Sequence, residues 1–464
     1  MKSPVIRDIV ENNLCIGCGL CAATCPQHSL EMVWNPYGEY NPVAMRSCDK
    51  ECGVCLKTCP FADGNDNEDI IGKSLYGRIP EISHRLETGY FLDCYVGYAP
   101  DTRERGSSGG MATWLFSTLL KKGIVDYVIA VIANDDPDRL FKFTIFSNHE
   151  DVINSSGSAY YPVELSGVIR EIQKRDGKCA VVGLPCFIKA IRLAAQKNKK
   201  LNEKIFVMVG LVCGQLKSKH FTGYISALSK VDGSLRKVIF RGKSPQKPAS
   251  NYYFSSTNTK GVTGKIFWNE GVSDAWLNRW FTPNPCNYCD DIFAECADVT
   301  FMDAWLPEYV KHNQGTSIVL VRSQLVREVI FHGMTDNEVN LGPIMIEKVI
   351  QSQAGIIEIK RRHLAFQLYL GHQRSLKIPK KRVAPIKLSN PFLSKQICLK
   401  NQMQAISREI WDPREQNVEL LNQKMQPFLA QQAKLNRFSR IFRLPIKAVR
   451  LTKRKIRRFL NGKG

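Results

Sequence analysis

The 464-residue sequence lacks any apolar stretch that could direct it into or across a membrane. Its first residues, MKSPVIRDIVENN, contain no apolar core of the length that a signal peptide requires. No later apolar run approaches the roughly 20 residues that span a bilayer. Histidine is also scarce, with eight residues and none in a metal-binding spacing. The sequence therefore predicts a cytoplasmic protein, whose 16 cysteines are expected to bind metal rather than form disulfides.

Acidic side chains are rare in the last fifth of the chain. From residue 371 to the C-terminus there are 23 Lys and Arg but only 4 Asp and Glu, so nearly all of the formal net charge of +22 lies there. The excess positive charge thus belongs to a C-terminal tail and not to the whole protein, so nucleic-acid binding is not expected. Residues 431–464 combine 12 basic residues, no acidic ones and apolar residues. Such a segment suits an anionic membrane surface, and a solvated tail is the alternative.

Eight cysteines near the N-terminus form two runs of four, each followed by proline. The runs are Cys15-x2-Cys18-x2-Cys21-x3-Cys25-Pro26 and Cys48-x3-Cys52-x2-Cys55-x3-Cys59-Pro60. In this pattern three closely spaced thiolates bind one [4Fe–4S] cluster, while the fourth binds the other cluster. The sequence therefore predicts two clusters, one held by Cys15, Cys18, Cys21 and Cys59, the other by Cys48, Cys52, Cys55 and Cys25. Structural zinc is the alternative, but zinc ligands normally come as two well-separated pairs.

The region from about residue 91 to about residue 373 alternates short β-rich runs with helical patterns. The clearest strands lie over 125–132, 179–184, 204–213 and 317–322, and the clearest helices over 111–123 and 187–199. This alternation predicts an α/β domain with a parallel or mixed sheet. The polar stretch 63–69 predicts an exposed linker. Beyond it, apolar residues recur at helical spacing in the C-terminal part, as at Val418, Leu421, Met425 and Phe428.

A Ser/Gly-rich loop, RGSSGG, stands just before the first of these helices. It contains Ser107, Ser108, Gly109 and Gly110, which would lie at the helix N-terminus. Free N–H groups and the helix dipole favour a phosphate there. Simple capping of the helix is the alternative.

Four further cysteines suggest a third cluster. Cys186 and Cys213 each follow an apolar, strand-like run, so both thiols would emerge at strand ends. Cys286 and Cys289 form a C-x2-C pair in the turn-rich segment TPNPCNYCDD. Together they supply the four ligands of a [4Fe–4S] cluster. The alternative is that Cys186 and Cys213 are small core residues.

Taken in order, these motifs resemble the family of beta subunits of coenzyme F420 hydrogenases and dehydrogenases, in the version with a fused N-terminal ferredoxin module. The resemblance runs from about Cys15 to about Arg322. Besides the cysteine runs, it rests on RGSSGG (105–110), GSAYYPVEL (157–165), GLPCFIKAIR (183–192), FRGK (240–243), CNYCDDIFAECADVTFMDAW (286–305) and GTSIVLVR (315–322).

The resemblance implies an iron–sulfur flavoprotein, because members of that family bind FAD and pass electrons between a deazaflavin, ferredoxin or another carrier and a substrate. It implies that the flavin is bound by Ser107, Ser108, Gly109 and Gly110 and near Ser158 and Tyr160. It implies that Arg241, Lys243, Asp303 and Trp305 line the flavin or substrate pocket. It also favours the third cluster on Cys186, Cys213, Cys286 and Cys289.

The expected fold is therefore a multidomain α+β and α/β chain. Residues 1–65 form a small bacterial-ferredoxin-like module and 66–90 a linker. Residues 91–373 form a larger mixed-sheet flavin and iron–sulfur domain, and 374–464 a basic helical extension.

Three positions depart from the family pattern. Ala159 stands where the family usually has Lys, and Leu184 and Phe187 replace Thr and Gln beside the Pro-Cys pair. A missing Lys removes one positive partner for a phosphate or for the flavin ring. Use of the deazaflavin is therefore not assumed.

The leading hypothesis is an oxidoreductase that takes electrons from ferredoxin or another carrier through the N-terminal clusters, the third cluster and FAD to an organic acceptor. If the tail docks at the inner face of the membrane, a membrane-linked glycan precursor is a candidate acceptor. The alternatives are an electron-transfer subunit serving a partner enzyme, and a membrane-docked binding or assembly protein with structural clusters. No catalytic residue and no oligomeric state follow from the sequence.

The remaining cysteines are expected to be packing residues: Cys94, Cys179, Cys296 and Cys398. The acids Asp298 and Asp303 are interpreted as a charged turn rather than as a catalytic pair.

Overall fold

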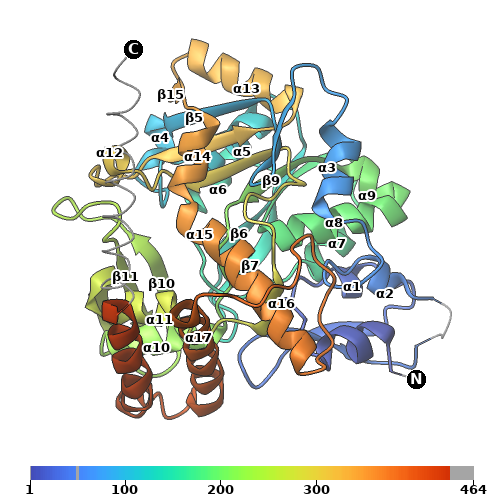
Figure 1. Cartoon of the computed structure of the whole chain (residues 1–464). Coiled ribbons are helices and arrows are strands. Elements are labelled where there is room, and N and C mark those ends of the chain that lie inside the picture. Colours follow the sequence, from blue (N-terminus) through green and yellow to red (C-terminus); the bar gives the residue numbers. More distant parts are fainter. Residues whose placement is uncertain (1, 49–51, 439–464) are drawn as a thin grey trace, which may run out of the picture.

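The N-terminal cysteines lie on a small module of short helices and one hairpin (Figure 1). The computed structural model describes residues 2–48 and 52–438. Strands β1 (Leu30–Trp34) and β2 (Tyr40–Ala44) pair antiparallel, and the helices are η1 (Ile6–Val10), α1 (Leu20–Ala23) and α2 (Val54–Lys57). Gly19 and Gly53, with φ of 82° and 56°, precede α1 and α2 and let the chain turn within each motif. Both motifs therefore fold in the same local way.

The segment that follows is more ordered than expected. Helix α3 (Glu68–Tyr76) begins at Asn67, whose side chain accepts a hydrogen bond from the amide of Ile70. Strands β3 (Ser83–Arg85) and β4 (Gly89–Phe91) form a hairpin. Glu68 is buried and lies 3.2 Å from the ammonium of Lys189. The prediction that residues 63–69 are exposed is therefore wrong at Glu68, because a partner distant in sequence buries its charge.

An eight-stranded sheet forms the centre of the molecule, in the order β15-β5-β14-β13-β9-β8-β6-β7. The neighbours β13, β9, β8 and β6 are parallel, and the other pairs are antiparallel. The sheet is thus mixed, as the sequence predicts. Its strands are β5 (Asp93–Tyr98), β6 (Tyr127–Ala133), β7 (Phe141–Phe146), β8 (Cys179–Gly183), β9 (Ile205–Leu211), β13 (Val299–Asp303), β14 (Ser317–Val321) and β15 (Asn340–Pro343).

Helices pack on this sheet and bury their apolar sides. Helix α5 (Met111–Lys121) buries Trp114, Leu115 and Leu119, and α8 (Pro185–Lys197) buries Ile188 and Ile191. Both agree with the helices predicted over 111–123 and 187–199. The other helices that follow in the chain around the sheet are α4 (Pro100–Arg103), α6 (His149–Asn154), α7 (Ser166–Ile172), α9 (Lys199–Lys204), α12 (Pro307–Val310), α13 (Gln324–Thr335) and α14 (Ile346–Ser352). The segment of α15 (Ala354–Glu358), η4 (Ile359–His363) and α16 (Leu364–Gln373) leads from there to the N-terminal module, where Leu364 and Leu368 are buried.

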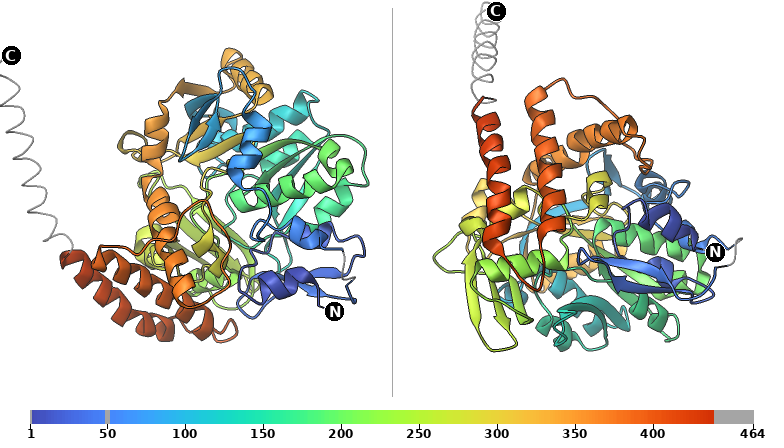
Figure 2. Two further views of the ribbon diagram at one scale, coloured as in Figure 1. Left: turned by 45° about the vertical axis from the view of Figure 1, so that its right-hand side comes forward. Right: turned by 90° about the horizontal axis from the view of Figure 1, so that it is seen from below.

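A second, three-stranded sheet lies beside the first, with the C-terminal helices next to it (Figures 1 and 2). Helix α17 (Pro391–Ile410) and a helix over 418–438 pack on its aromatic core, where Leu421 and Met425 are fully buried. The helical pattern predicted at Val418, Leu421, Met425 and Phe428 is thus confirmed. Residues 376–390 of the expected helical extension form no helix, and residues 439–464 lie outside the described part. The remaining elements are β10 (Leu235–Gly242), β11 (Tyr253–Asn258), β12 (Thr263–Phe267), α10 (Lys219–Leu228), η2 (Trp268–Val272), α11 (Ser273–Leu277) and η3 (Asn284–Tyr288).

Candidate functional site

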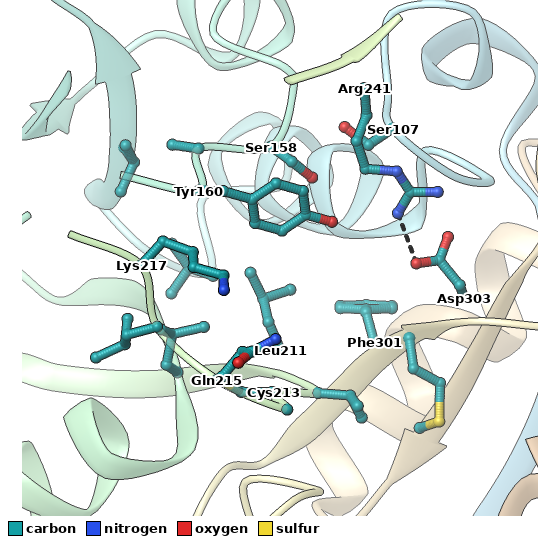
Figure 3. Close-up of a pocket in the computed structure, with 18 of the residues that line it drawn as sticks. Ser107, Ser158, Tyr160, Leu211, Cys213, Gln215, Lys217, Arg241, Phe301 and Asp303 are labelled. Atoms are coloured by element: carbon teal, nitrogen blue, oxygen red, sulfur yellow. Dashed lines mark hydrogen bonds and ion pairs between the residues drawn. The ribbon is translucent and has the colours of Figure 1, made fainter. Parts of the chain in front are cut away.

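A cavity of about 790 Å³ lies at the sheet edge where the parallel strands end (Figure 3). Its lining includes Val131 of β6, Gly183 of β8, Leu211 of β9 and Asp303 of β13. These strands run parallel, so their carboxyl ends meet at one edge, which is where open α/β sheets bind ligands. The volume falls within the range of roughly 300–1,000 Å³ typical of cofactor and substrate sites.

Most of the residues predicted to bind a flavin line this cavity. They come from four separate stretches of sequence: Ser107, Ser108, Gly110, Ser158, Tyr160, Arg241, Asp303 and Trp305. The departures Ala159, Leu184 and Phe187 line it as well. Gly109 and Lys243 are not among the lining residues. Their hydrogen bonds instead hold the Ser/Gly loop in place.

The Ser/Gly loop is fixed against the ends of β5 and β14. The amide of Gly109 donates to the Ser317 hydroxyl at 3.0 Å, and a Cβ at Gly109 would lie 2.6 Å from the carbonyl oxygen of Gly97. The ammonium of Lys243 donates to the carbonyl of Ser108 at 2.9 Å and also to that of Arg103. The ammonium of Lys243 thus holds the loop, and Lys243 is not among the residues that line this cavity. Its place in a flavin or substrate pocket stays a prediction. The loop is thus rigid where helix α5 begins.

Arg241 is a charged residue of the cavity wall that an ion pair and two aromatic rings hold in place. Its guanidinium lies 2.6 Å from the Asp303 carboxylate and between the rings of Tyr252 and Trp305, at 4.6 and 5.5 Å from their centroids. Burial lowers the pKa of Arg241, but Asp303, Tyr160 and Tyr252 together raise it above the ordinary arginine value, so the side chain stays charged. Its Nε atom is buried and has no hydrogen-bond partner among the described residues. The cavity therefore offers a buried, charged donor to a bound anion.

The four cysteines of the predicted third cluster come together. Cys186 lies at the start of α8, Cys213 just beyond β9, Cys286 in η3 and Cys289 just after η3. Because β8 and β9 are parallel neighbours, the residues that follow them emerge at the same edge of the sheet. Burial raises the pKa of Cys186, and the neighbouring thiols of Cys289, Cys213 and Cys286 raise it further. The predicted position of Cys186 and Cys213 at strand ends is thus confirmed.

A buried lysine lies near three of these four thiols. Lys360 of η4 is 2% exposed, and Cys289, Cys213 and Cys286 act on its charge. Burial lowers its pKa, but the thiols of Cys289, Cys213 and Cys286 raise it above the ordinary lysine value. A buried ammonium is costly unless negative charge surrounds it, and metal-bound thiolates supply that charge. The residues therefore fit an anionic iron–sulfur cluster.

The N-terminal cysteines of the first predicted set also lie together. Burial raises the pKa of Cys21, and the thiols of Cys18, Cys15 and Cys59 raise it further. Cys59 from the second run thus reaches the first three cysteines, as crossed ligation requires. Within the described residues, no three His, Cys, Asp or Glu side chains close on a single metal ion.

Two thiols of the second predicted set lie beside serine hydroxyls. The thiol of Cys25 lies 3.2 Å from the Ser29 hydroxyl, and that of Cys55 lies 3.5 Å from the Ser3 hydroxyl. The three residues between Cys48 and Cys52 lie outside the described part. A cluster on Cys25, Cys48, Cys52 and Cys55 stays a prediction.

The two assembled thiol sets lie close to each other and to the cavity. Cys18 is near enough to Cys186 to contribute to the rise of the Cys186 pKa, after burial and the nearer thiols. Cys15 and Cys213, one from each set, both line the cavity. The cavity therefore adjoins both thiol sets.

Three basic residues of the site carry no recognisable signal in the sequence. Lys217, Arg279 and Lys400 line the cavity together with the predicted residues. Lys217 donates to the carbonyl of Trp280 at 2.7 Å and to the Thr282 hydroxyl at 3.1 Å. Burial, followed by the charge of Arg279, lowers the pKa of Lys217 well below the ordinary range. These residues belong to no motif, and only tertiary packing brings them together.

The acids interpreted as a charged turn do not face each other. Asp298 pairs with Arg192 at 3.2 Å, and Asp303 pairs with Arg241.

The cysteines predicted to be packing residues are largely enclosed. Cys94, Cys179 and Cys296 are buried in hydrophobic clusters, and Cys398 is half-buried on α17.

Comparison with known proteins assigns the whole middle of the chain. Residues 94–170 match the N-terminal model and residues 176–346 the C-terminal model of the coenzyme F420 hydrogenase/dehydrogenase beta subunit, and residues 9–31 match a 4Fe–4S binding domain. The chain is 22% identical over 329 residues to one of the subunits of the F(420)H(2) dehydrogenase of Methanosarcina mazei, covering 69% of this chain and 83% of that protein.

Two further matches are more distant or partial. The chain is 23% identical to coenzyme F420-dependent sulfite reductase of Methanocaldococcus jannaschii, over 70% of this chain and 46% of that protein. A chain of the F420-reducing [NiFe] hydrogenase complex of Methanosarcina barkeri aligns with a TM-score of 0.47 at 18% identity, over 62% of this chain and 96% of that one. With both beta-subunit models matched in order behind a 4Fe–4S binding domain, the chain belongs to the family of coenzyme F420 hydrogenase/dehydrogenase beta subunits.

Proposed function

We propose that this chain is an iron–sulfur flavoprotein oxidoreductase that exchanges electrons between a one-electron carrier and an organic acceptor bound in the cavity. The observation that carries the proposal is that Cys15 and Cys213, from two separate four-thiol sets, line the same cavity as Ser107, Tyr160 and Arg241. Iron–sulfur clusters transfer single electrons, and a flavin links them to two-electron chemistry. In this proposal residues 1–65 hold two clusters and residues 91–373 form the catalytic domain.

The residues of the chain have distinct tasks in this proposal. The loop at the N-terminus of α5 offers the Ser107 hydroxyl and backbone amides to a flavin phosphate. The Ser108 hydroxyl instead donates to the Thr316 carbonyl at 2.9 Å and holds the loop. Arg241, fixed by Asp303, offers its free Nε to an electron-rich part of the cofactor. Lys360 balances the negative charge of the thiolates from Cys186, Cys213, Cys286 and Cys289. The aromatic walls exclude water from the reactants.

Purification under strict anoxia tests the proposal. The purified chain should contain FAD, and photoreduced ferredoxin should reduce it. Cys213→Ser should retain FAD but lose its reduction by ferredoxin, because Cys213 belongs to the thiol set that lines the cavity. Failure to bind FAD, even after incubation with excess FAD, would reject the flavoprotein assignment.

A second candidate is an electron-transfer subunit that serves a partner enzyme. The relative of this chain in Methanosarcina mazei is named as one of the subunits of a dehydrogenase. Gentle anaerobic purification from the native cell distinguishes the two candidates. A stoichiometric complex whose activity is lost when the partner is removed supports the electron-transfer role, and activity of the isolated chain supports the oxidoreductase.

The membrane prediction concerns residues 431–464, of which 439–464 lie outside the described part. No helix among the described residues is long and apolar enough to span a bilayer. Docking on anionic lipid, and with it a membrane-linked glycan acceptor, stays a prediction. Co-sedimentation with phosphatidylglycerol vesicles tests it, because a chain ending at Gln431 should pellet less than the full chain. Equal pelleting contradicts docking.

A further inference from the structure

Arg279 is a buried arginine at the cavity wall with unused hydrogen-bonding groups. It follows helix α11, is 8% exposed and lines the cavity. Its Nε and Nη2 atoms are buried and have no hydrogen-bond partner among the described residues. Its φ of 64° is unusual for a residue with a side chain, so the surrounding packing enforces this position. An unpaired buried guanidinium is costly, and a bound anion would remove that cost.

Two further basic side chains line the same cavity. His363 ends η4, and Lys400 lies on α17 of the C-terminal extension. Burial and the nearby charge of Arg279 lower the pKa of Lys400 to about 8. Burial, together with Lys400 and Arg279, lowers that of His363 to about 4. All three side chains line the one cavity, and their charges disfavour one another there.

The carboxylates of the cavity wall do not balance these charges. Asp303 is paired with Arg241 at 2.6 Å, and Glu39 accepts a hydrogen bond from Arg408 at 3.1 Å. No other Asp or Glu occurs among the described residues that line the cavity. The thiols of Cys286, Cys289 and Cys213 raise the pKa of Arg279, against the larger lowering by burial. Neither carboxylate of the cavity wall therefore pairs with Arg279 or Lys400.

Helix α17 is attached to the segment that carries Arg279. The amide of Phe281 donates to the Ser407 hydroxyl at 2.7 Å, and the Gln404 side chain donates to the carbonyl of Thr282 at 2.7 Å. Both contacts lie within three residues of Arg279. They fix the position of Lys400, one and two turns earlier on the same helix, relative to that arginine.

We propose that Arg279, His363 and Lys400 form an anion-binding subsite that holds a carboxylate or phosphate group of the acceptor substrate. Arginine and lysine are suited to such groups through charge-assisted hydrogen bonds. Helix α17 lies outside the residues matched by the family models, which end at 346. The C-terminal extension thus adds substrate selectivity to a shared redox domain. Identification of the occupant as the acceptor rests on the proposed function.

A phosphate of FAD is the other source of the same anion chemistry. Helix α5, at whose N-terminus the Ser/Gly loop lies, and helix α17 are well separated (Figure 1). The Ser/Gly loop is therefore assigned to the flavin, and the subsite of Arg279 to the acceptor.

Calorimetric titration tests the subsite. The anaerobically purified full chain is titrated with inorganic phosphate and, separately, with malonate, at constant ionic strength set by chloride. Lys400→Met should weaken binding of at least one probe about tenfold, as expected for the loss of one charged hydrogen bond. Lys395→Met is the matched control, because Lys395 is exposed on the same helix and should leave binding unchanged. Arg279→Lys, which keeps the charge but loses the planar fork, should also weaken binding.

Unchanged affinity in both Lys400→Met and Arg279→Lys would overturn the subsite. Loss of FAD from Lys400→Met in proportion to the loss of anion binding would also overturn it, because the anion would then be the flavin phosphate. If the purified chain holds no flavin or iron but Lys400→Met still loses the probe, the subsite stands and the proposed redox function fails.

Discussion

Replacing Lys360 by Met removes a buried positive charge beside three cysteine thiols. Lys360 is 2% exposed and is influenced most strongly by Cys289, then by Cys213 and Cys286. Methionine retains the length and apolar character of the side chain but not the charge. If the thiols hold a cluster, the ammonium favours its reduced form, because reduction adds one negative charge. The Lys360→Met variant should therefore have a more negative cluster potential.

The size of the shift follows from Coulomb's law. For a separation of about 6 Å and an effective dielectric constant of about 20, the interaction is about 3 kcal/mol. For a one-electron couple, about 1.4 kcal/mol corresponds to about 59 mV, so the expected shift is on the order of 100 mV.

An anaerobic redox titration followed by electron paramagnetic resonance measures this shift. Arg362→Met is the matched control, because Arg362 lies on the same helix, is exposed and pairs with Glu358 at 3.1 Å. It should leave all potentials unchanged. A Lys360→Met protein with full iron content and no potential moved beyond that of the control would refute the placement of a cluster at this site.

Three further substitutions test other parts of the account. Cys186→Ser should lower the iron and acid-labile sulfide by one cluster and block electron transfer to the flavin, while the N-terminal cluster signals persist; unchanged iron with full activity contradicts the third cluster. Arg382→Leu should lower the free energy of unfolding in urea by about 3–5 kcal/mol, because it leaves the buried carboxylates around Glu295 without their cation; a loss below about 1 kcal/mol contradicts this. Arg241→Gln should release FAD more readily than the exposed same-strand control Arg236→Gln; equal retention of FAD argues against Arg241 as a flavin contact.

The backbone architecture around the site was largely predictable because it depends on local patterns. Apolar runs fixed the positions of β8 and β9, and the residues after parallel strands necessarily emerge at one edge of the sheet. Cys186 and Cys213 could therefore be placed at strand ends from the sequence. The helical spacing of Leu421 and Met425 predicted a buried helical face in the same way, and both are fully buried.

The charged part of the site could not be predicted, because tertiary packing brings it together. Arg279, Lys360 and Lys400 come from three elements far apart in the sequence. Each resembles an ordinary surface residue when only its neighbours in the sequence are considered. Lys243 is the opposite case, a residue that a sequence motif did single out. The motif suggested that Lys243 lines the pocket, but its ammonium holds the loop at Ser108.

The central claim is that the thiols beside the cavity bind iron–sulfur clusters. Chemical analysis of iron, acid-labile sulfide and zinc in the anaerobically purified full chain tests this claim most directly. We predict iron and sulfide in equal amounts, sufficient for three [4Fe–4S] clusters per chain, and a brown protein that dithionite bleaches. A colourless chain that contains zinc and no acid-labile sulfide would contradict the account.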